Sequence, residues 1–258
     1  MRTALSFVAL MILTSVLLLV ITFKTYPEAL PEGKMVSYKS DGETISGFLI
    51  TPEGMGPFPA IIVIQEWWGL NDQIKNKATE LAKEGYVTLA VDLYRGKVTT
   101  DPEEAHELLR GLPEDRAIRD LLSAVSYLKT LPNVKKDKIG SIGWCMGGGY
   151  SLSLAINNPD ITACVIYYGR LITDKDQLGR IKASVIGFFG EDDRGIPPSS
   201  VRAFEDDMKA LGEDVSVYIY PGAGHAFANE EKPSYNPKAA MDSWEKTLSF
   251  FNKKLGSK

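Results

Sequence analysis

Short apolar runs alternate with longer amphipathic segments over most of this chain. Apolar runs of this kind are typical of strands buried on both faces of a sheet, and the segments between them have the periodicity of helices. The expected strands cover residues 60–64, 86–91, 139–144, 161–167, 184–189 and 215–220, and the expected helices cover 72–84, 114–129, 146–157, 199–211 and 238–255. This alternation predicts an α/β fold with a mostly parallel central sheet and helices on both faces. Residues 34–38 and 44–51, on either side of a turn signal at 40–43, predict an antiparallel N-terminal hairpin at one edge.

Composition excludes several classes of function. The 258 residues are enough for one large α/β domain, and the net charge of −4 comes without a cluster of Lys and Arg, which argues against a nucleic-acid partner. Two cysteines and two histidines are too few for a disulfide framework or a four-ligand zinc site. There is no Gly-rich phosphate loop of the P-loop type. We therefore expect a small-molecule substrate and neither a cofactor nor a metal.

The N-terminal segment differs from the rest of the chain. Residues 4–23 contain no charged side chain, and a run of this length can just cross a bilayer. A cleaved signal peptide normally ends in small residues of the A-x-A type, which are absent here, so an uncleaved anchor is favoured over a signal. We expect residues 1–25 to be a membrane anchor or signal, 26–33 a linker, and 34–258 the folded domain. That domain is expected outside the cytoplasm, either anchored or, if the segment is cleaved, secreted or periplasmic. Arg2 and Lys24 flank the run on both sides, so the orientation stays open.

The motif Gly143-Trp144-Cys145-Met146-Gly147 lies between a predicted strand and a predicted helix. A nucleophile on such a turn adopts a strained conformation, and the flanking glycines relieve clashes with neighbouring backbone. The beginning of a helix also favours a thiolate through the helix dipole. A lone free cysteine is most often a small buried residue, but this context favours a nucleophile. The other cysteine, Cys164, lies within an apolar strand and is expected in the core.

A nucleophile on this turn needs a base and an acid later in the chain. His225 follows the last predicted strand in a glycine-rich loop, whereas His106 lies on a charged helical surface and is expected to be solvated. The acid should lie between the nucleophile and the histidine. Asp192 and Asp193, after the strand at 184–189, both satisfy this order, and spacing does not separate them.

Five motifs together resemble the dienelactone hydrolase family of α/β-hydrolases. They are Gln65-Glu66-Trp67-Trp68-Gly69, Asp92-Leu93-Tyr94-Arg95-Gly96, Gly143 to Gly148, Gly190-Glu191-Asp192-Asp193 with Ile196-Pro197, and Gly224-His225-Ala226-Phe227. The resemblance implies an α/β-hydrolase fold and a Cys145, Asp193 and His225 triad. It also implies that Glu66 contacts the resting thiol and controls its conversion to thiolate.

Substrate contacts follow from the same fold and resemblance. The expected oxyanion donors are the backbone N–H groups of Met146 and Trp67, with Trp67 and Trp68 as pocket wall. In the family, two arginines bind a substrate carboxylate. Arg95 corresponds loosely to one of them, with a plain surface role as the alternative, and Asn229 stands in place of the other. Since asparagine cannot bind a carboxylate as arginine does, the sequence argues against hydrolysis of dienelactone itself.

The expected function is therefore hydrolysis of carboxylic esters or lactones through an acyl-enzyme on Cys145. The alternatives are a thioesterase or peptidase-like hydrolase with the same triad, and a non-catalytic binding protein of this fold. A thiol redox protein would need a resolving cysteine near Cys145, and the sequence has no C-x-x-C motif. The sequence leaves the oligomeric state open, with a monomer as one option.

Overall fold

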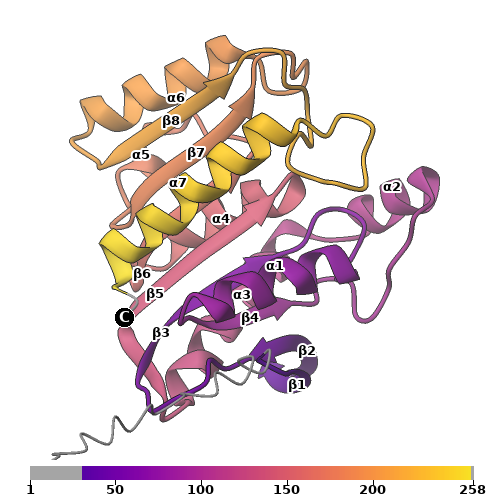
Figure 1. Ribbon diagram of the computed structural model, residues 1–258, viewed down its shortest axis with the longest axis vertical. Coiled ribbons are helices and arrows are strands. Elements are labelled where there is room, and N and C mark those ends of the chain that lie inside the picture. Colours follow the sequence, from indigo (N-terminus) through magenta and orange to yellow (C-terminus); the bar gives the residue numbers. More distant parts are fainter. Residues whose placement is uncertain (1–30, 257–258) are drawn as a thin grey trace, which may run out of the picture. The chain divides into compact units, whose positions relative to one another are not determined.

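A single eight-stranded sheet organises residues 31–256, which are the residues that the computed structural model describes (Figure 1). Its strands are β1 (Gly33–Ser40), β2 (Glu43–Ile50), β3 (Phe58–Ile64), β4 (Val87–Val91), β5 (Val134–Trp144), β6 (Ile161–Tyr167), β7 (Ser184–Gly190) and β8 (Val215–Tyr220). Their order in space is β1-β2-β4-β3-β5-β6-β7-β8. β1 and β2 form an antiparallel hairpin, β2 pairs antiparallel with β4, and β3 to β8 run parallel. The predicted mostly parallel sheet with an N-terminal hairpin is confirmed.

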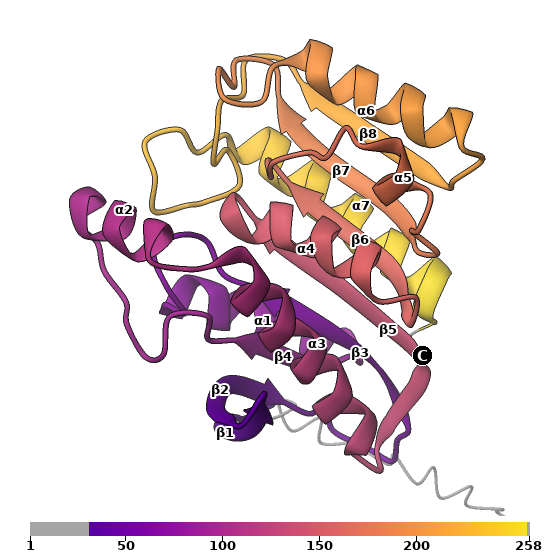
Figure 2. The same ribbon diagram turned by 180° about the vertical axis from the view of Figure 1, so that it is seen from behind.

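Helices cover both faces of the sheet. The helices are α1 (Asp72–Lys83), α2 (Pro102–Arg110), α3 (Glu114–Thr130), α4 (Met146–Asn157), α5 (Lys175–Leu178), α6 (Pro198–Ala210) and α7 (Pro237–Leu255). The apolar side chains of α1 and α7 share one core cluster, on the face seen in Figure 1. Those of α3, α4 and α6 share the other, and α3 and α4 cover the face seen in Figure 2. α2 projects beyond the carboxyl ends of the strands (Figures 1 and 2).

The central strand β3 shows why its sequence is continuously apolar. Ile62 and Ile64 lie in the core cluster under α3 and α4, while Ile61 and Val63 lie in the cluster under α1 and α7, and all four are fully buried. Successive side chains of a strand point to opposite faces, so a strand covered on both sides has no polar position. The carboxyl ends of these buried strands meet at one edge, where the loops that follow them carry the candidate site residues.

Three elements differ from the sequence predictions. β5 begins at Val134 rather than at residue 139. The sequence did not predict its first part because Lys135 to Lys138 are exposed or partly exposed and carry no apolar pattern. α2 is a complete helix capped by Asp101. Of its residues, Ala105 alone is fully buried in the described structure, so the sequence offered no apolar face from which to predict the bounds of this helix. α5 is a single turn that no periodic pattern can reveal.

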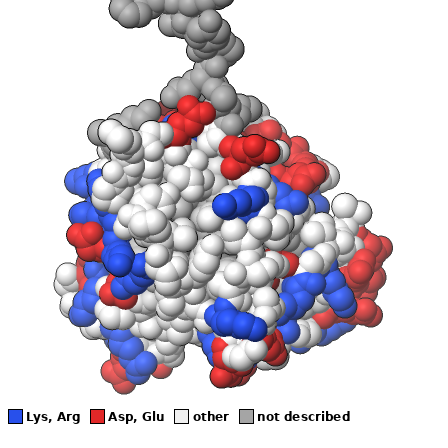
Figure 3. Space-filling view, turned by 90° about the horizontal axis from the view of Figure 1, so that it is seen from below, with Lys and Arg blue, Asp and Glu red and all other residues white. Residues whose placement is uncertain are grey.

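The surface and the chain ends add two observations. On the face shown in Figure 3, basic and acidic side chains are intermingled around an uncharged centre. Within the described part of the chain, no helix combines the length and the hydropathy needed to cross a membrane. The predicted anchor or signal at 1–25 and the first part of the linker lie outside the described residues.

Candidate active site

Cys145 occupies a sharp turn between β5 and α4, with φ 54° and ψ −117°. Positive φ is strained for a residue with a side chain and persists only where the surrounding structure enforces it. The flanking glycines are part of that structure. A Cβ atom at Gly143 would lie 2.0 Å from the carbonyl oxygen of Gly147, and one at Gly147 would lie 2.3 Å from that of Ile64. The Gly-x-Cys-x-Gly spacing therefore lets α4 begin directly against β5 and the end of β3, with Cys145 half-buried at its N-terminus.

His225 and Asp193 reach Cys145 from the loops after β8 and β7. His225 Nε2 lies 3.1 Å from Cys145 Sγ, and its Nδ1 lies 2.7 Å from Asp193 Oδ2. The other oxygen of Asp193 accepts hydrogen bonds from the backbone N–H groups of Gly195 and Ile196, which fixes the carboxylate. Three side chains from distant parts of the chain thus form one continuous hydrogen-bonded line.

The same contacts set the protonation of this line. Burial by itself lowers the pKa of His225, but the hydrogen bonds to Asp193 and Cys145 and their negative charge outweigh it and raise this pKa to about 10. Burial by itself raises the pKa of Asp193, but the hydrogen bond and charge of His225 prevail and lower it. The arrangement therefore favours an imidazolium beside an ionised Asp193. Asp192, the alternative acid, is exposed and does not face the histidine in this arrangement.

Glu66 lies buried after β3, 2% exposed, and binds two other buried side chains. Tyr168 donates its hydroxyl to Glu66 Oε1 at 3.3 Å, and Asn229 donates its amide to Glu66 Oε2 at 2.8 Å. Burial raises the pKa of Glu66, while the bond from Asn229, the charge of His225 and the bond from Tyr168 oppose the rise. The hydrogen-bond partners of Glu66 are thus Tyr168 and Asn229, whereas direct contact with the thiol was expected.

Tyr168 is a site residue that the sequence prediction missed. It follows β6 with φ 36°, and its ring packs edge-on against His225 at 5.2 Å between centroids. Burial, followed by the charges of Glu66 and Cys145, raises the pKa of its hydroxyl well above the ordinary value, so the group stays a donor. Its position directly after a buried strand was the one available signal, since such positions face the carboxyl edge of the sheet.

A cavity of about 630 Å³ opens beside Cys145 and His225. Met146 and Trp67, the expected oxyanion donors, both line it. This follows from the close approach of Gly147 to the carbonyl groups of Ile64 and Gln65, which places the first turn of α4 against the loop that carries Trp67. Within residues 31–256, no three His, Cys, Asp or Glu side chains converge as metal ligands would.

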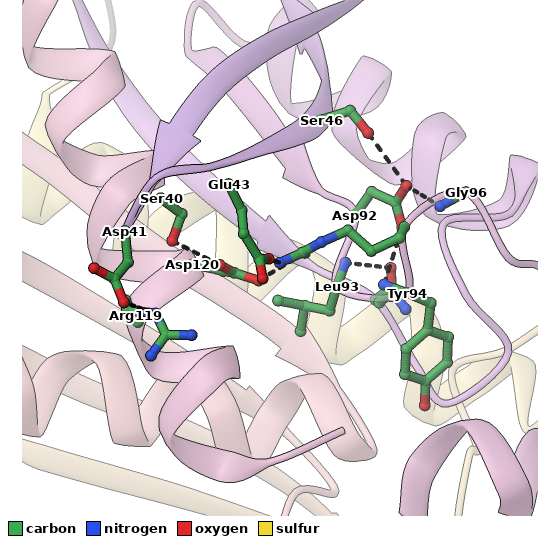
Figure 4. A network of polar contacts seen from close by, with 12 residues as sticks. Ser40, Asp41, Glu43, Ser46, Asp92, Leu93, Tyr94, Gly96, Arg119 and Asp120 are labelled. Atoms are coloured by element: carbon green, nitrogen blue, oxygen red, sulfur yellow. Dashed lines mark hydrogen bonds and ion pairs between the residues drawn. The ribbon is translucent and has the colours of Figure 1, made fainter. Parts of the chain in front are cut away.

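Two residues expected to bind substrate lie away from this cavity. Trp68 is buried, with Lys232 Nζ 3.4 Å from its ring centroid, and only Trp67 reaches the cavity wall. Arg95 instead binds Asp120, at 2.7 Å, and Glu43, at 3.0 Å. Both carboxylates belong to the polar network drawn in Figure 4. The guanidinium of Arg95 ties the β1–β2 hairpin to α3 instead of pointing toward Cys145.

The two remaining sequence candidates also have clear positions. Cys164 is fully buried within β6, 3.4 Å from Ser151 Oγ, and burial raises the pKa of its thiol to about 11. His106 is exposed on α2, as expected, but its ring packs edge-on against Trp67 at 4.7 Å between centroids. It therefore helps to fix α2 over the loop that lines the cavity.

Comparison with known proteins agrees with this geometry. The family model described as "Dienelactone hydrolase family" matches residues 45–255, nearly the whole described domain. The chain belongs to the dienelactone hydrolase family. It is therefore a hydrolase acting on ester or lactone bonds, with the α/β-hydrolase fold.

Relatives of this dienelactone hydrolase family member cover almost its full folded length. A candidate carboxymethylenebutenolidase of Methylorubrum extorquens is 32% identical over 244 residues, covering 89% of this chain and 84% of the relative. "Protein usf" of Aquifex pyrophilus is 34% identical, covering 86% of this chain and 99% of its own. Among solved structures, a promiscuous dienelactone hydrolase-like phosphotriesterase from metagenomic libraries superposes with a TM-score of 0.81 at 27% identity, covering 88% of this chain and 100% of its own.

Proposed function

We propose that this family member hydrolyses carboxylic esters or lactones with Cys145 as the nucleophile, through a thioester acyl-enzyme. The observation that carries the proposal is the hydrogen-bonded line Cys145–His225–Asp193, with distances of 3.1 Å and 2.7 Å, at the wall of a substrate-sized cavity. A nucleophile, a base within hydrogen-bond reach and an acid that orients the base are the parts that acyl transfer requires.

The steps follow from the positions of these groups. With the thiol proton of Cys145 held on His225 Nε2, the thiolate sulfur attacks the carbonyl carbon. The resulting oxyanion accepts hydrogen bonds from the backbone N–H groups of Met146 and Trp67. Collapse of this intermediate breaks the carbon–oxygen bond, and the leaving alkoxide takes the proton from His225. A water molecule, deprotonated by His225, then attacks the thioester and releases the carboxylic acid and the thiolate. Asp193 holds the imidazole in one orientation throughout.

Two buried side chains, Glu66 and Tyr168, contact the base of this triad or its neighbours. Tyr168 packs against His225 and binds Glu66, so the two buried groups link the base to the loop that carries Trp67. We propose that Glu66 biases the charge state of the Cys145 and His225 pair, since a buried carboxylate near the pair favours the imidazolium.

Two cysteine variants test the nucleophile. We expect Cys145→Ala to lower the rate of p-nitrophenyl acetate hydrolysis by about 10⁴-fold or more, as loss of a nucleophile does in comparable triads. Cys164→Ala is the matched control, because this buried thiol lies outside the cavity, and it should leave the rate within about threefold. Intact mass spectrometry of the quenched reaction should show one acetyl group on Cys145. Unchanged activity in Cys145→Ala would refute the mechanism.

We also propose that residues 1–25 attach the domain to a membrane, with the catalytic domain outside the cytoplasm. The support is the uncharged run at 4–23 and the absence of a small-residue cleavage site. Fractionation of expressing cells and the intact mass of the purified chain test this. A full-length chain in the membrane fraction is expected, whereas a shortened chain in the medium or periplasm would indicate a cleaved signal.

A further inference from the structure

The cavity beside Cys145 extends along one face of α4. Cys145, Gly149 and Ser153 recur every four residues, and all three line the cavity together with Tyr150. Residues four apart lie above one another on a helix, so this lining is a continuous stripe. Eight residues at 1.5 Å each make the stripe about 12 Å long. The cavity therefore extends along α4 beyond the reacting thiol.

The cavity lining also includes apolar side chains from outside α4. They are Leu109 at the end of α2, Leu112 in the loop that follows it, and Ile196 in the loop after β7. Sites that bind small molecules are mostly apolar with a few placed polar groups, and a volume of about 630 Å³ lies within their usual range.

The charged side chains of this lining form one ion pair beside the middle of the stripe, where Arg170 adjoins Gly149. Among the described lining residues other than His225, the charged ones are Glu114 and Arg170, and these two bind each other at 3.1 Å. Both are more than half exposed, so the pair is solvated and electrically balanced. A carboxylate bound along the stripe would lose hydration and would meet a guanidinium that Glu114 already neutralises, which is unfavourable. Arg95 is bound to Asp120 and Glu43, and Asn229 is bound to Glu66, so neither offers such a carboxylate another partner.

The reaction itself fixes which part of the substrate occupies the stripe. The leaving oxygen must lie near His225 Nε2 to receive its proton, and the carbonyl oxygen must face the N–H groups of Met146 and Trp67. The remaining substituent of the carbonyl carbon, the acyl group, is then directed away from His225 and along α4.

We infer that the substrate is a neutral ester or lactone with an extended apolar acyl group, which binds along the α4 stripe from Cys145 to Ser153. This inference rests on the proposed function, because it assumes acyl transfer at Cys145. It assigns Ser153 as the residue that sets acyl length and excludes acyl groups that end in a carboxylate.

A series of p-nitrophenyl esters tests the inference in the full-length protein. Burial of one methylene corresponds to about a fourfold gain in kcat/KM, so we expect this rise for each added carbon from acetate to hexanoate. In Ser153→Phe the rise should stop at butyrate, so that the ratio of kcat/KM for hexanoate to that for butyrate falls from about sixteenfold to about one. Ser126→Phe is the matched control, since Ser126 is exposed on α3 outside the cavity, and it should keep the wild-type series.

A second comparison tests the charge of the acyl group. We expect the mono-p-nitrophenyl ester of glutaric acid to react at least tenfold more slowly than p-nitrophenyl valerate, and Arg170→Gln to leave this ratio unchanged. A preference for the glutarate ester that Arg170→Gln removes would overturn the inference and make Arg170 a carboxylate binder. A flat chain-length series with Cys145-dependent acetate hydrolysis would overturn it while leaving the proposed function standing. Loss of Cys145 dependence would instead refute the proposed function.

Discussion

Substitution of Asn229 tests whether its hydrogen bond to buried Glu66 stabilises the folded domain. Asn229 is fully buried, donates to Glu66 Oε2 at 2.8 Å and accepts a hydrogen bond from the backbone N–H of Glu231 at 3.0 Å. Asn229→Ala removes both bonds. A hydrogen bond to a charged group contributes about 1.5–3 kcal/mol and a neutral one about 0.5–1.5 kcal/mol. We therefore expect the free energy of unfolding to fall by about 3 kcal/mol.

Urea denaturation measures this loss. The midpoint should fall while the m-value stays constant, because the surface exposed on unfolding hardly changes. For a domain of this size, the same loss corresponds to a fall in melting temperature of about 6–12 °C. Asn252→Ala, at an exposed position on α7, is the matched control and should change stability by less than about 0.5 kcal/mol.

The pH dependence of the loss separates the bond to Glu66 from simple packing. The bond from Asn229 lowers the pKa of Glu66, so it is stronger when Glu66 is ionised. The loss in Asn229→Ala should therefore be larger at pH 8 than at pH 4. A loss as small as that of Asn252→Ala, or one independent of pH, would refute the view that Asn229 stabilises the Glu66 carboxylate.

Three further predictions concern ionisable groups. Burial raises the pKa of Glu66, so the contribution of this side chain to folding stability is complete below its ordinary pKa of 4.5 and is lost as pH rises through the raised pKa. Glu66→Gln should therefore be more stable than wild type at pH 8 but not at pH 4. Urea titrations at both pH values measure the difference. The pKa of His225 is also raised, so its contribution to folding stability is likewise lost as pH rises. The melting temperature of wild type should exceed that of His225→Gln most near pH 6, and this difference should disappear as pH rises from 6.5 through about 10. A difference that is constant with pH would contradict the pairing with Asp193. Arg95→Met leaves the buried Asp120 without its 2.7 Å partner and should cost about 3 kcal/mol of stability at pH 7, with kcat/KM on p-nitrophenyl acetate unchanged; a selective loss of kcat/KM would place Arg95 in the substrate site after all.

The sequence by itself determined the fold class and the position of Cys145, the proposed nucleophile. Fully buried strands such as β3 have no polar position, so their apolar runs alternate with helices in a pattern that a parallel sheet requires. The turn at Cys145 also depends on local sequence, because glycine at positions 143 and 147 allows α4 to begin against β5. Chain order then restricted the base to His225 and the acid to two neighbouring aspartates.

Only the tertiary structure decided which side chains face one another. The family resemblance pointed to Asp193, and the structure shows the physical basis: Asp193 binds His225 while Asp192 is exposed, although the two are adjacent in the chain and identical in chemistry. Asn229 binds buried Glu66, and Arg95 ties the hairpin to α3, so neither of them lines the cavity along α4. The reason is physical: periodicity and local turns record which face of an element is buried, whereas a contact between residues more than a hundred positions apart depends on how the whole sheet and its loops pack.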